Sequence, residues 1–328
     1  MAKDKKNATQ LQLWFEDAWE GWIRPLGLIL LLAIGYLLYK FDIVGERTTG
    51  ITAVLAIVVG AIVVGALPAL PLATKPWQRA LLATMVAAAL AGMVYPSVRA
   101  AVPGRQYVEA TLTNDKPTAT MTTGASGPYE LLVSGHFKDA GRQDAEATYT
   151  LKVSDNGGGS EEVNGEIARK LVTIHSRKGG SSSSVQEQNE EKHRLGKILG
   201  PQVTITADGV DEQLESGLTV ALRAGGLDPV VFIVLGALAI LIGLVLDTRL
   251  VDQKGKQKAY LTAAMAIAFS FSMYYWRDAT PSRLVKTAVS ALFFALIVGG
   301  IGGWAAGGIA RALFGPKIPK KKSAASSR

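Results

Sequence analysis

Three histidines are the side chains with the clearest capacity for acid–base or metal chemistry in this chain. The sequence contains no cysteine, which excludes disulfides, thiolate nucleophiles and cysteine-based zinc sites. His136, His175 and His193 are widely separated, and none has a second histidine or a carboxylate at a spacing typical of a metal site. We therefore expect no catalytic residue, no cofactor and no metal, and a protein that is not an enzyme.

One segment concentrates charge of both signs beside a stretch rich in serine: Glu187, Glu190, Glu191, Lys192, His193 and Arg194. A mixed run of this kind is usually a solvated face, and we interpret it as one. Residues 178–191, with four consecutive serines, predict a mobile loop.

Six apolar stretches are the elements that must position any functional site. They occur as two groups of three, and each comes close to or exceeds the length of about 20 residues that crosses a bilayer core. Their ranges are 22–39, 51–73, 80–98, 229–246, 259–276 and 287–310. The sequence therefore predicts a membrane α-helical protein with about six transmembrane helices, arranged three plus three around an inserted domain.

Ionisable residues are missing from these stretches, apart from Arg24 near the start of the first. Transporters, pumps and intramembrane hydrolases usually keep such groups at depth, because those groups do the chemistry. The pattern weighs against active transport and membrane-embedded catalysis. It leaves open a passive pore lined by backbone and small side chains.

Small residues recur every four positions in the last stretch: Ala291, Ala295, Gly299, Gly303 and Gly307. Helices in lipid pack closely through such stripes, since lipid supplies no hydrophobic drive between them. We predict a helix-packing surface, which either packs within the chain or forms an oligomer interface or a pore.

Aromatic residues mark two expected membrane interfaces. Trp14, Trp19 and Trp22 follow one face of an amphipathic N-terminal segment, and Tyr274, Tyr275 and Trp276 end the fifth stretch. Rings of this kind sit at headgroup depth, so we predict that all six residues are interfacial anchors.

Basic residues fix the expected orientation. Segments on the N-terminal side hold sixteen Lys and Arg: four before or at the first stretch, two after the second, four after the fourth and six in the tail. The opposite short loops hold five. By the positive-inside rule both termini are cytoplasmic, so the net charge of +8 is accounted for by topology and no nucleic-acid partner is expected. A large exterior domain without cysteine indicates a bacterial inner membrane, with residues 101–225 periplasmic.

The middle of the chain alternates apolar and polar residues. Val203, Ile205 and Ala207 alternate with threonines, Tyr129, Leu131 and Val133 repeat the pattern, and residues 155–158 predict a turn. About seven or eight short antiparallel strands are typical of a β-sandwich or jelly roll. Residues 161–174 fit a strand or a helix equally well.

These patterns predict five regions: an amphipathic N-terminus (1–21), helices (22–98), an exterior β domain (101–225), helices (229–310) and a basic cytoplasmic tail (311–328). We expect a non-enzymatic inner-membrane subunit or scaffold whose β domain binds an envelope partner or ligand. The alternative is a homo-oligomeric channel or passive transport component built on the glycine-rich sixth helix. Expected partners are membrane lipid and other membrane or envelope subunits, including further copies of the chain itself.

Overall fold

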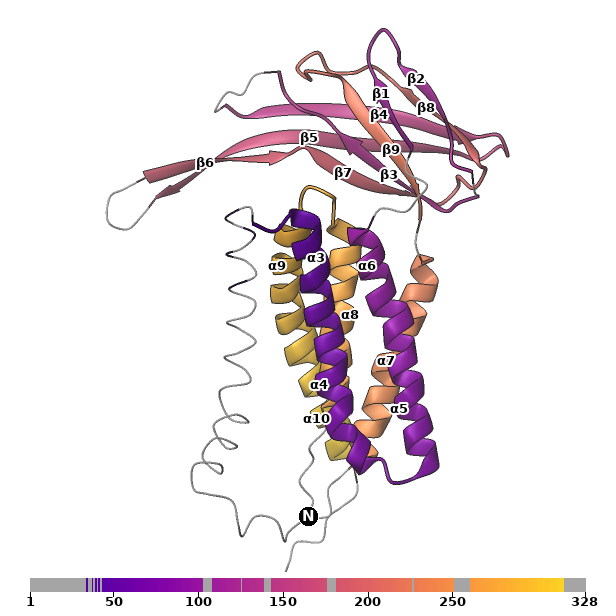
Figure 1. Cartoon of the computed structure of the whole chain (residues 1–328), viewed down its shortest axis with the longest axis vertical. Coiled ribbons are helices and arrows are strands. Elements are labelled where there is room, and N and C mark those ends of the chain that lie inside the picture. The colour runs from indigo at the N-terminus through magenta and orange to yellow at the C-terminus, as the bar shows by residue number, and fades with distance from the viewer. Residues whose placement is uncertain are drawn as a thin grey trace, which may run out of the picture.

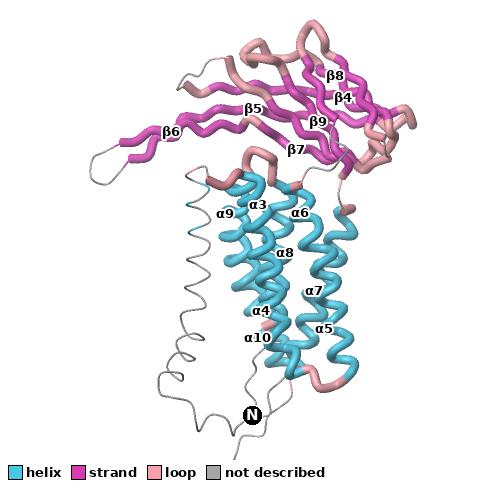
Figure 2. Tube along the Cα trace, viewed as in Figure 1, coloured by secondary structure: helices cyan, strands magenta, loops and turns pink. Residues whose placement is uncertain are grey.

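A helical bundle carries a β domain at one end (Figure 1). The computed structural model describes residues 34, 37, 39, 41, 43–102, 108–124, 126–138, 143–175, 181–225, 227–250 and 260–315 of the 328. The helices lie side by side below and the strands cross above them (Figure 2).

Four helical stretches in the described residues are long and apolar enough to cross a membrane. Their lengths of 27, 26, 21 and 31 residues meet the requirement of about 20 residues. The first comprises α3 (Glu46–Val54), η3 (Leu55–Val59), α4 (Gly60–Ala69) and η4 (Leu70–Leu72), and the second α5 (Pro76–Ala89), η5 (Leu90–Val94) and α6 (Tyr95–Ala101). The third is α7 (Pro229–Arg249), and the fourth comprises α9 (Leu284–Phe294), η6 (Ala295–Ile301) and α10 (Gly302–Phe314).

These four stretches coincide with the second, third, fourth and sixth predicted spans, so the described helices support fewer than six. The first predicted span lies outside the described residues apart from Ile34, Leu37 and Tyr39. The fifth forms α8 (Leu261–Asp278), a helix that is not among the four. Its serines and its Tyr-Tyr-Trp-Arg-Asp end lower its hydropathy.

The fifth span differs because α8 is the central helix of the bundle. It contacts α4, α7, α9, η6 and α10, and it buries Met265, Ala268 and Phe271 completely. Ser272 is also buried, bonded to Ser97 on α6 and to the carbonyl of Met93. Protein rather than lipid surrounds much of this helix, so it does not need an apolar surface all round.

The first turn of α8 is capped by a side chain from another helix. Asp247 on α7 is 1% exposed, and its carboxylate accepts the backbone N–H groups of Leu261 and Thr262 at 3.0 Å each. The first N–H groups of a helix have no partner within the helix, so this contact fixes the start of α8. The guanidinium of Arg311 on α10 lies 3.9 Å from the same carboxylate.

In the described residues between the two groups of helices, all the long regular elements are strands. They are β1 (Val108–Leu112), β2 (Thr118–Thr122), β3 (Tyr129–Ser134), β4 (Ala145–Asp155), β5 (Ser160–His175), β6 (Ser181–Gln188), β7 (Glu190–Leu195), β8 (Gln202–Ala207) and β9 (Leu218–Ala224). Two antiparallel sheets form, in the orders β1-β9-β3-β7 and β2-β8-β4-β5-β6, and together they resemble a half-barrel. The prediction of an inserted β domain is confirmed at this level.

The alternating apolar residues form the core between the sheets. Leu131, Val133, Val203 and Ile205 are completely buried, as their period-two spacing predicted. Residues 161–174 are strand rather than helix, because they pair with β4 along most of its length. The predicted loop over residues 178–191 was wrong for Ser181–Gln188, which form β6: pairing with β5 outweighs the turn-like composition.

Asp155 holds the β4–β5 turn against the segment between β7 and β8. One carboxylate oxygen accepts from the N–H groups of Gly157 and Gly159, and the other from those of Leu199 and Gly200, at 2.7–2.9 Å. These bonds, with Gly200 contributing most, lower the pKa of Asp155 to about 2. The folded protein therefore stabilises the charged carboxylate of Asp155.

We predict that Asp155→Asn lowers the thermal midpoint of the β domain at pH 7, because an amide replaces one acceptor oxygen with a donor. A depressed carboxylate pKa stabilises the fold above the ordinary value of 3.8 and loses that effect as pH falls toward 2. The difference from wild type, measured by circular dichroism on heating, should therefore shrink from pH 5 to pH 2. A difference that stays constant over this range would contradict the assignment.

Candidate functional site

The β domain contacts the bundle through the outer face of the sheet β1-β9-β3-β7. Along β7, Glu191, His193 and Leu195 pair opposite the core residues of β3, so they face the other sheet. The alternate residues Lys192 and Arg194 point the opposite way, toward the helices. We call this contact region the junction. It comprises the ends of α8 and α9 and the side chains of Glu130, Glu190, Lys192, Arg194 and Arg223.

Lys192 caps the C-terminal end of α8. Its ammonium donates to the carbonyl oxygens of Trp276 at 2.5 Å and Ala279 at 3.0 Å. The last carbonyls of a helix lack partners within the helix and carry its partial negative charge, so a cation there is favourable. Burial lowers the pKa of Lys192 to about 8, with a partly compensating rise from Glu130.

Arg194 reinforces the same contact. Its guanidinium lies over the ring of Trp276, 3.2 Å from the centroid, and donates to the Trp276 carbonyl at 3.4 Å. Burial lowers the pKa of Arg194, although Glu130 opposes this effect. Two cations of the sheet therefore converge on one helix end.

Glu130 balances these cations from the next strand. It pairs in register with Arg194 on β7 and with Arg223 on β9, which makes a row of cation, anion and cation across three strands. Arg223 Nε donates to Glu130 at 2.7 Å, and Arg194 Nε lies 3.7 Å away. Glu130 and Arg223 are 6% and 7% exposed. A buried carboxylate requires such partners, because an unpaired one would be strongly destabilising.

The turn between α8 and α9 makes a second set of contacts. Glu190 accepts from the backbone N–H of Ser282 at 3.2 Å and from its hydroxyl at 2.5 Å. Arg283 donates to the carbonyl of Glu187. At the start of α9, the Val285 N–H donates to Glu46 of α3 at 2.8 Å.

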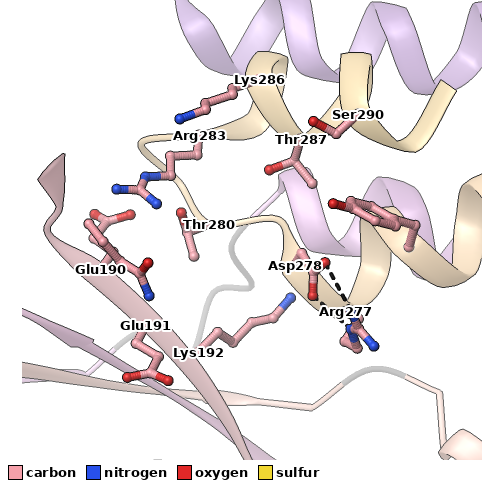
Figure 3. Close-up of a pocket in the computed structure, with 12 residues that line it drawn as sticks. Glu190, Glu191, Lys192, Arg277, Asp278, Thr280, Arg283, Lys286, Thr287 and Ser290 are labelled. Carbon is pink, nitrogen blue, oxygen red and sulfur yellow. Dashed lines mark hydrogen bonds and ion pairs between the residues drawn. The ribbon is translucent and has the colours of Figure 1, made fainter. Parts of the chain in front are cut away.

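A polar cavity of about 440 Å³ lies beside the junction, between β7 and the α8–α9 turn (Figure 3). Its lining combines both charges with hydroxyl groups: Gln188, Glu190, Glu191, Lys192, Tyr274, Arg277, Asp278, Thr280, Arg283, Lys286, Thr287 and Ser290. A second cavity of about 270 Å³ shares Arg283 and Lys286 with it. Arg277 is already paired with Asp278 at 2.8 Å.

Glu191 also joins a hydrogen-bonded cluster on the core side of β7. The hydroxyl of Tyr149 lies 2.9 Å from Glu191 and 2.8 Å from His193 Nε2, and Glu191 accepts the Glu166 N–H at 3.0 Å. Gly165 makes room for this cluster, because a Cβ on residue 165 would lie within 2.3 Å of both the Tyr149 hydroxyl oxygen and a Glu191 carboxylate oxygen.

Burial is also the main electrostatic effect on this cluster, and it raises the pKa of Tyr149. It would raise the pKa of Glu191 too, but bonds from His193, the Glu166 N–H and Tyr149 outweigh it and lower that pKa. The three side chains satisfy one another, which is typical of a structural polar network. No group of three or more His, Asp or Glu in the described part of the chain is placed to hold a metal ion.

The small-residue stripe lies against α8. Ala291, Ala295, Gly299, Gly303 and Gly307 are all buried. A Cβ on Gly299 would lie 2.5 Å from the Ala266 carbonyl oxygen, and one on Gly303 would lie 2.8 Å from Ala263 Cα. This face is therefore covered by the chain's own central helix.

Of the six aromatic residues predicted to be interfacial anchors, the structure describes three. Trp14, Trp19 and Trp22 lie outside the described residues. Tyr275 and Trp276 are 0% and 5% exposed, so protein covers both, and Tyr274 is half-buried against Phe294.

Sequence reasoning missed the junction, because it treated the charged segment around Lys192 as a solvated face. A weak signal was present: Glu130 and Arg223 are single charges within otherwise apolar strands. Buried charges need partners, so such residues point to a charged surface on a neighbouring element. Which element supplies it depends on pairing between strands far apart in the sequence.

The chain matches no protein-family model, and no curated protein is significantly similar to it. Its function is therefore argued from its own geometry.

We predict that Lys192→Ala lowers the free energy of unfolding by about 1–3 kcal/mol, because two helix-end carbonyls lose a charged donor. Lys152→Ala, which removes an exposed lysine of β4, is the matched control and should have little effect. Thermal unfolding of the detergent-solubilised full chain measures both.

The effect of Lys192→Ala should also grow with pH. A folded pKa of about 8, below the ordinary 10.5, means that the unfolded chain binds this proton more tightly. The wild type therefore gains stability from this group between pH 8 and pH 10.5, and the alanine variant does not. A difference that shrinks between pH 7 and pH 10 would contradict the lowered pKa and therefore the burial of the Lys192 ammonium.

Proposed function

We propose that the chain is a non-enzymatic membrane subunit or scaffold whose β domain binds an envelope partner at the membrane surface. The observation that carries this proposal is the junction. Charged side chains fix the sheet directly to the ends of α8 and α9, so the domain is presented by a firm base rather than tethered by a linker.

The finer membrane arrangement belongs to the same proposal. Six spans, with both termini cytoplasmic and residues 101–225 on the exterior of a bacterial inner membrane, agree with the excess of basic residues in the sequence segments on the N-terminal side of the spans. Two of these residues, Lys75 and Arg79, lie at the start of α5. The position of the β domain at the opposite end of the helices supports this orientation (Figure 1).

A two-stranded ribbon is the surface we propose for the partner. We define the ribbon as residues 170–175 of β5 and 181–186 of β6, which pair with each other beyond the end of β4. It projects past the rest of the β domain (Figure 1). Leu171 and Val185 face each other across it and are each 38% exposed.

The edge position of β6 favours a protein partner. It is the last strand of its sheet, so no strand formed by the described residues lies beside one row of its backbone N–H and C=O groups. A ribbon of two strands is marginally stable alone and gains from an added strand. Strand addition supplies main-chain hydrogen bonds, while side chains such as Leu171 supply specificity.

A photo-crosslinking amino acid at Val185 should yield one discrete adduct with another envelope protein in native membranes. The same amino acid at Thr120, exposed on β2 in the same sheet, is the matched control and should not yield it. Replacing residues 172–184 with Asn-Gly keeps Leu171 opposite Val185 in a tight hairpin, and should abolish binding of the captured partner to the purified chain. Identical adducts from both positions, or binding unaffected by the shortened ribbon, would contradict the proposal.

The channel alternative has less support, because α8 covers the glycine stripe that would have to form its interface or lining.

A further inference from the structure

The cavity beside the junction holds a buried polar group that the fold leaves unsatisfied. Thr280 is 5% exposed and lines the cavity, and its hydroxyl oxygen has no hydrogen-bond partner among the described residues. A buried hydroxyl without a partner is destabilising, so a ligand that supplies a partner for it binds more tightly.

Two cations line the same cavity as this hydroxyl. Arg283 and Lys286, at the start of α9, lie on the same side of the cavity as Thr280 (Figure 3). Lys286 is exposed and makes no ion pair with a described residue, and among the described residues the Arg283 side chain hydrogen-bonds only to the backbone carbonyl of Glu187. A hydroxyl and two cations in one cavity are suited to the oxygen atoms of a phosphate.

Carboxylates line the cavity as well. Glu190 uses one oxygen, Oε2, for both of its bonds to Ser282, which leaves Oε1 available. Asp278 lies nearby, paired with Arg277. A lining that contains both cations and carboxylates fits a group that carries both a phosphate and an ammonium.

The apolar surface below the cavity indicates where such a group comes from. Lys286, Thr287 and Ser290 line the cavity, and the same helix then presents Val289, Phe293 and Ile297, which are 42%, 63% and 61% exposed. The cavity therefore opens at the polar end of a helix that is apolar enough to cross a membrane. A free phosphate compound would not use this apolar surface, whereas a lipid would.

We propose that this cavity binds the headgroup of a zwitterionic phospholipid, with the phosphate at Thr280, Arg283 and Lys286 and the ammonium facing Glu190. The acyl chains then lie along the exposed face of α9 and η6. Because the lining comes from β7 as well as from α8 and α9, the bound lipid joins the β domain to the bundle. This inference rests on the proposed membrane location but not on the proposed partner of the ribbon.

The test is lipid binding to the delipidated full chain in detergent, followed by native mass spectrometry and thermal unfolding. Dioleoyl phosphatidylethanolamine should bind with one tight site and raise the thermal midpoint. Dioleoyl phosphatidylglycerol, which lacks the ammonium, should bind at least about tenfold more weakly, as expected for one lost charged contact. Soluble phosphoethanolamine and inorganic phosphate should not protect the protein at the same concentration.

Two variants separate binding from folding. Thr280→Val removes the hydroxyl but keeps the shape, so the lipid-free midpoint should stay the same or rise while affinity for the ethanolamine lipid falls. Thr280→Ser should restore affinity. Lys286→Gln should weaken binding about tenfold, whereas Arg47→Gln should not; Arg47 is an exposed basic residue in the first turn of α3, next to Glu46, which binds the start of α9.

Wild-type affinity in both Thr280→Val and Lys286→Gln would overturn the inference. So would equal protection by soluble phosphoethanolamine, because the ligand would then not be a lipid. The variant with the shortened ribbon should keep the lipid. If the wild-type chain binds the lipid but no partner is captured at Val185, or the captured partner still binds the shortened ribbon, the proposed function alone fails. If a ribbon partner is captured and lost on shortening but the wild-type chain does not bind the lipid, this inference alone fails.

Discussion

The end carbonyls of a helix need donors from outside the helix, and α8 receives its donors from the β domain. The ammonium of Lys192 and the guanidinium of Arg194 converge on the carbonyl of Trp276, and Lys192 also binds that of Ala279. At the other end, Asp247 of α7 accepts the first N–H groups of α8. The central helix is thus fixed at both ends by other elements, and the rest of the structure is arranged around it.

This arrangement explains why charges are buried where the two parts of the molecule meet. Cations brought onto a helix end lose hydration, and Glu130 offsets part of that loss from the neighbouring strand. The geometry demands fixed distances, so the sheet cannot shift on the bundle without breaking several contacts at once. A domain held in this way can present its ribbon and its lipid-facing cavity at a constant height above the membrane.

The sequence predicted those parts of the fold that depend on local periodicity. Alternation in Val203 and Ile205 identified strands with a buried face, and the long apolar stretches identified four helices able to cross a membrane. The fifth predicted span corresponds to α8, which is less apolar than the other four helices because its hydroxyls and aromatic end pack largely against protein. The sequence reasoning missed the junction, since the partners of Lys192 lie more than 80 residues away and are set by tertiary packing. The strand β6 was mistaken for a loop because pairing, not composition, makes it a strand.

The most direct test of the account is whether the β domain is fixed on the bundle in the membrane. The chain has no cysteine, so Glu190→Cys with Ser282→Cys gives a single pair of thiols at the junction. A short bifunctional thiol reagent applied to intact membranes should join this pair within one chain almost completely. The control pair, Glu109→Cys with Ser282→Cys, uses an exposed residue of β1 at the other edge of the same sheet and should not react. Equal cross-linking of the two pairs, or none in either, would contradict a fixed junction.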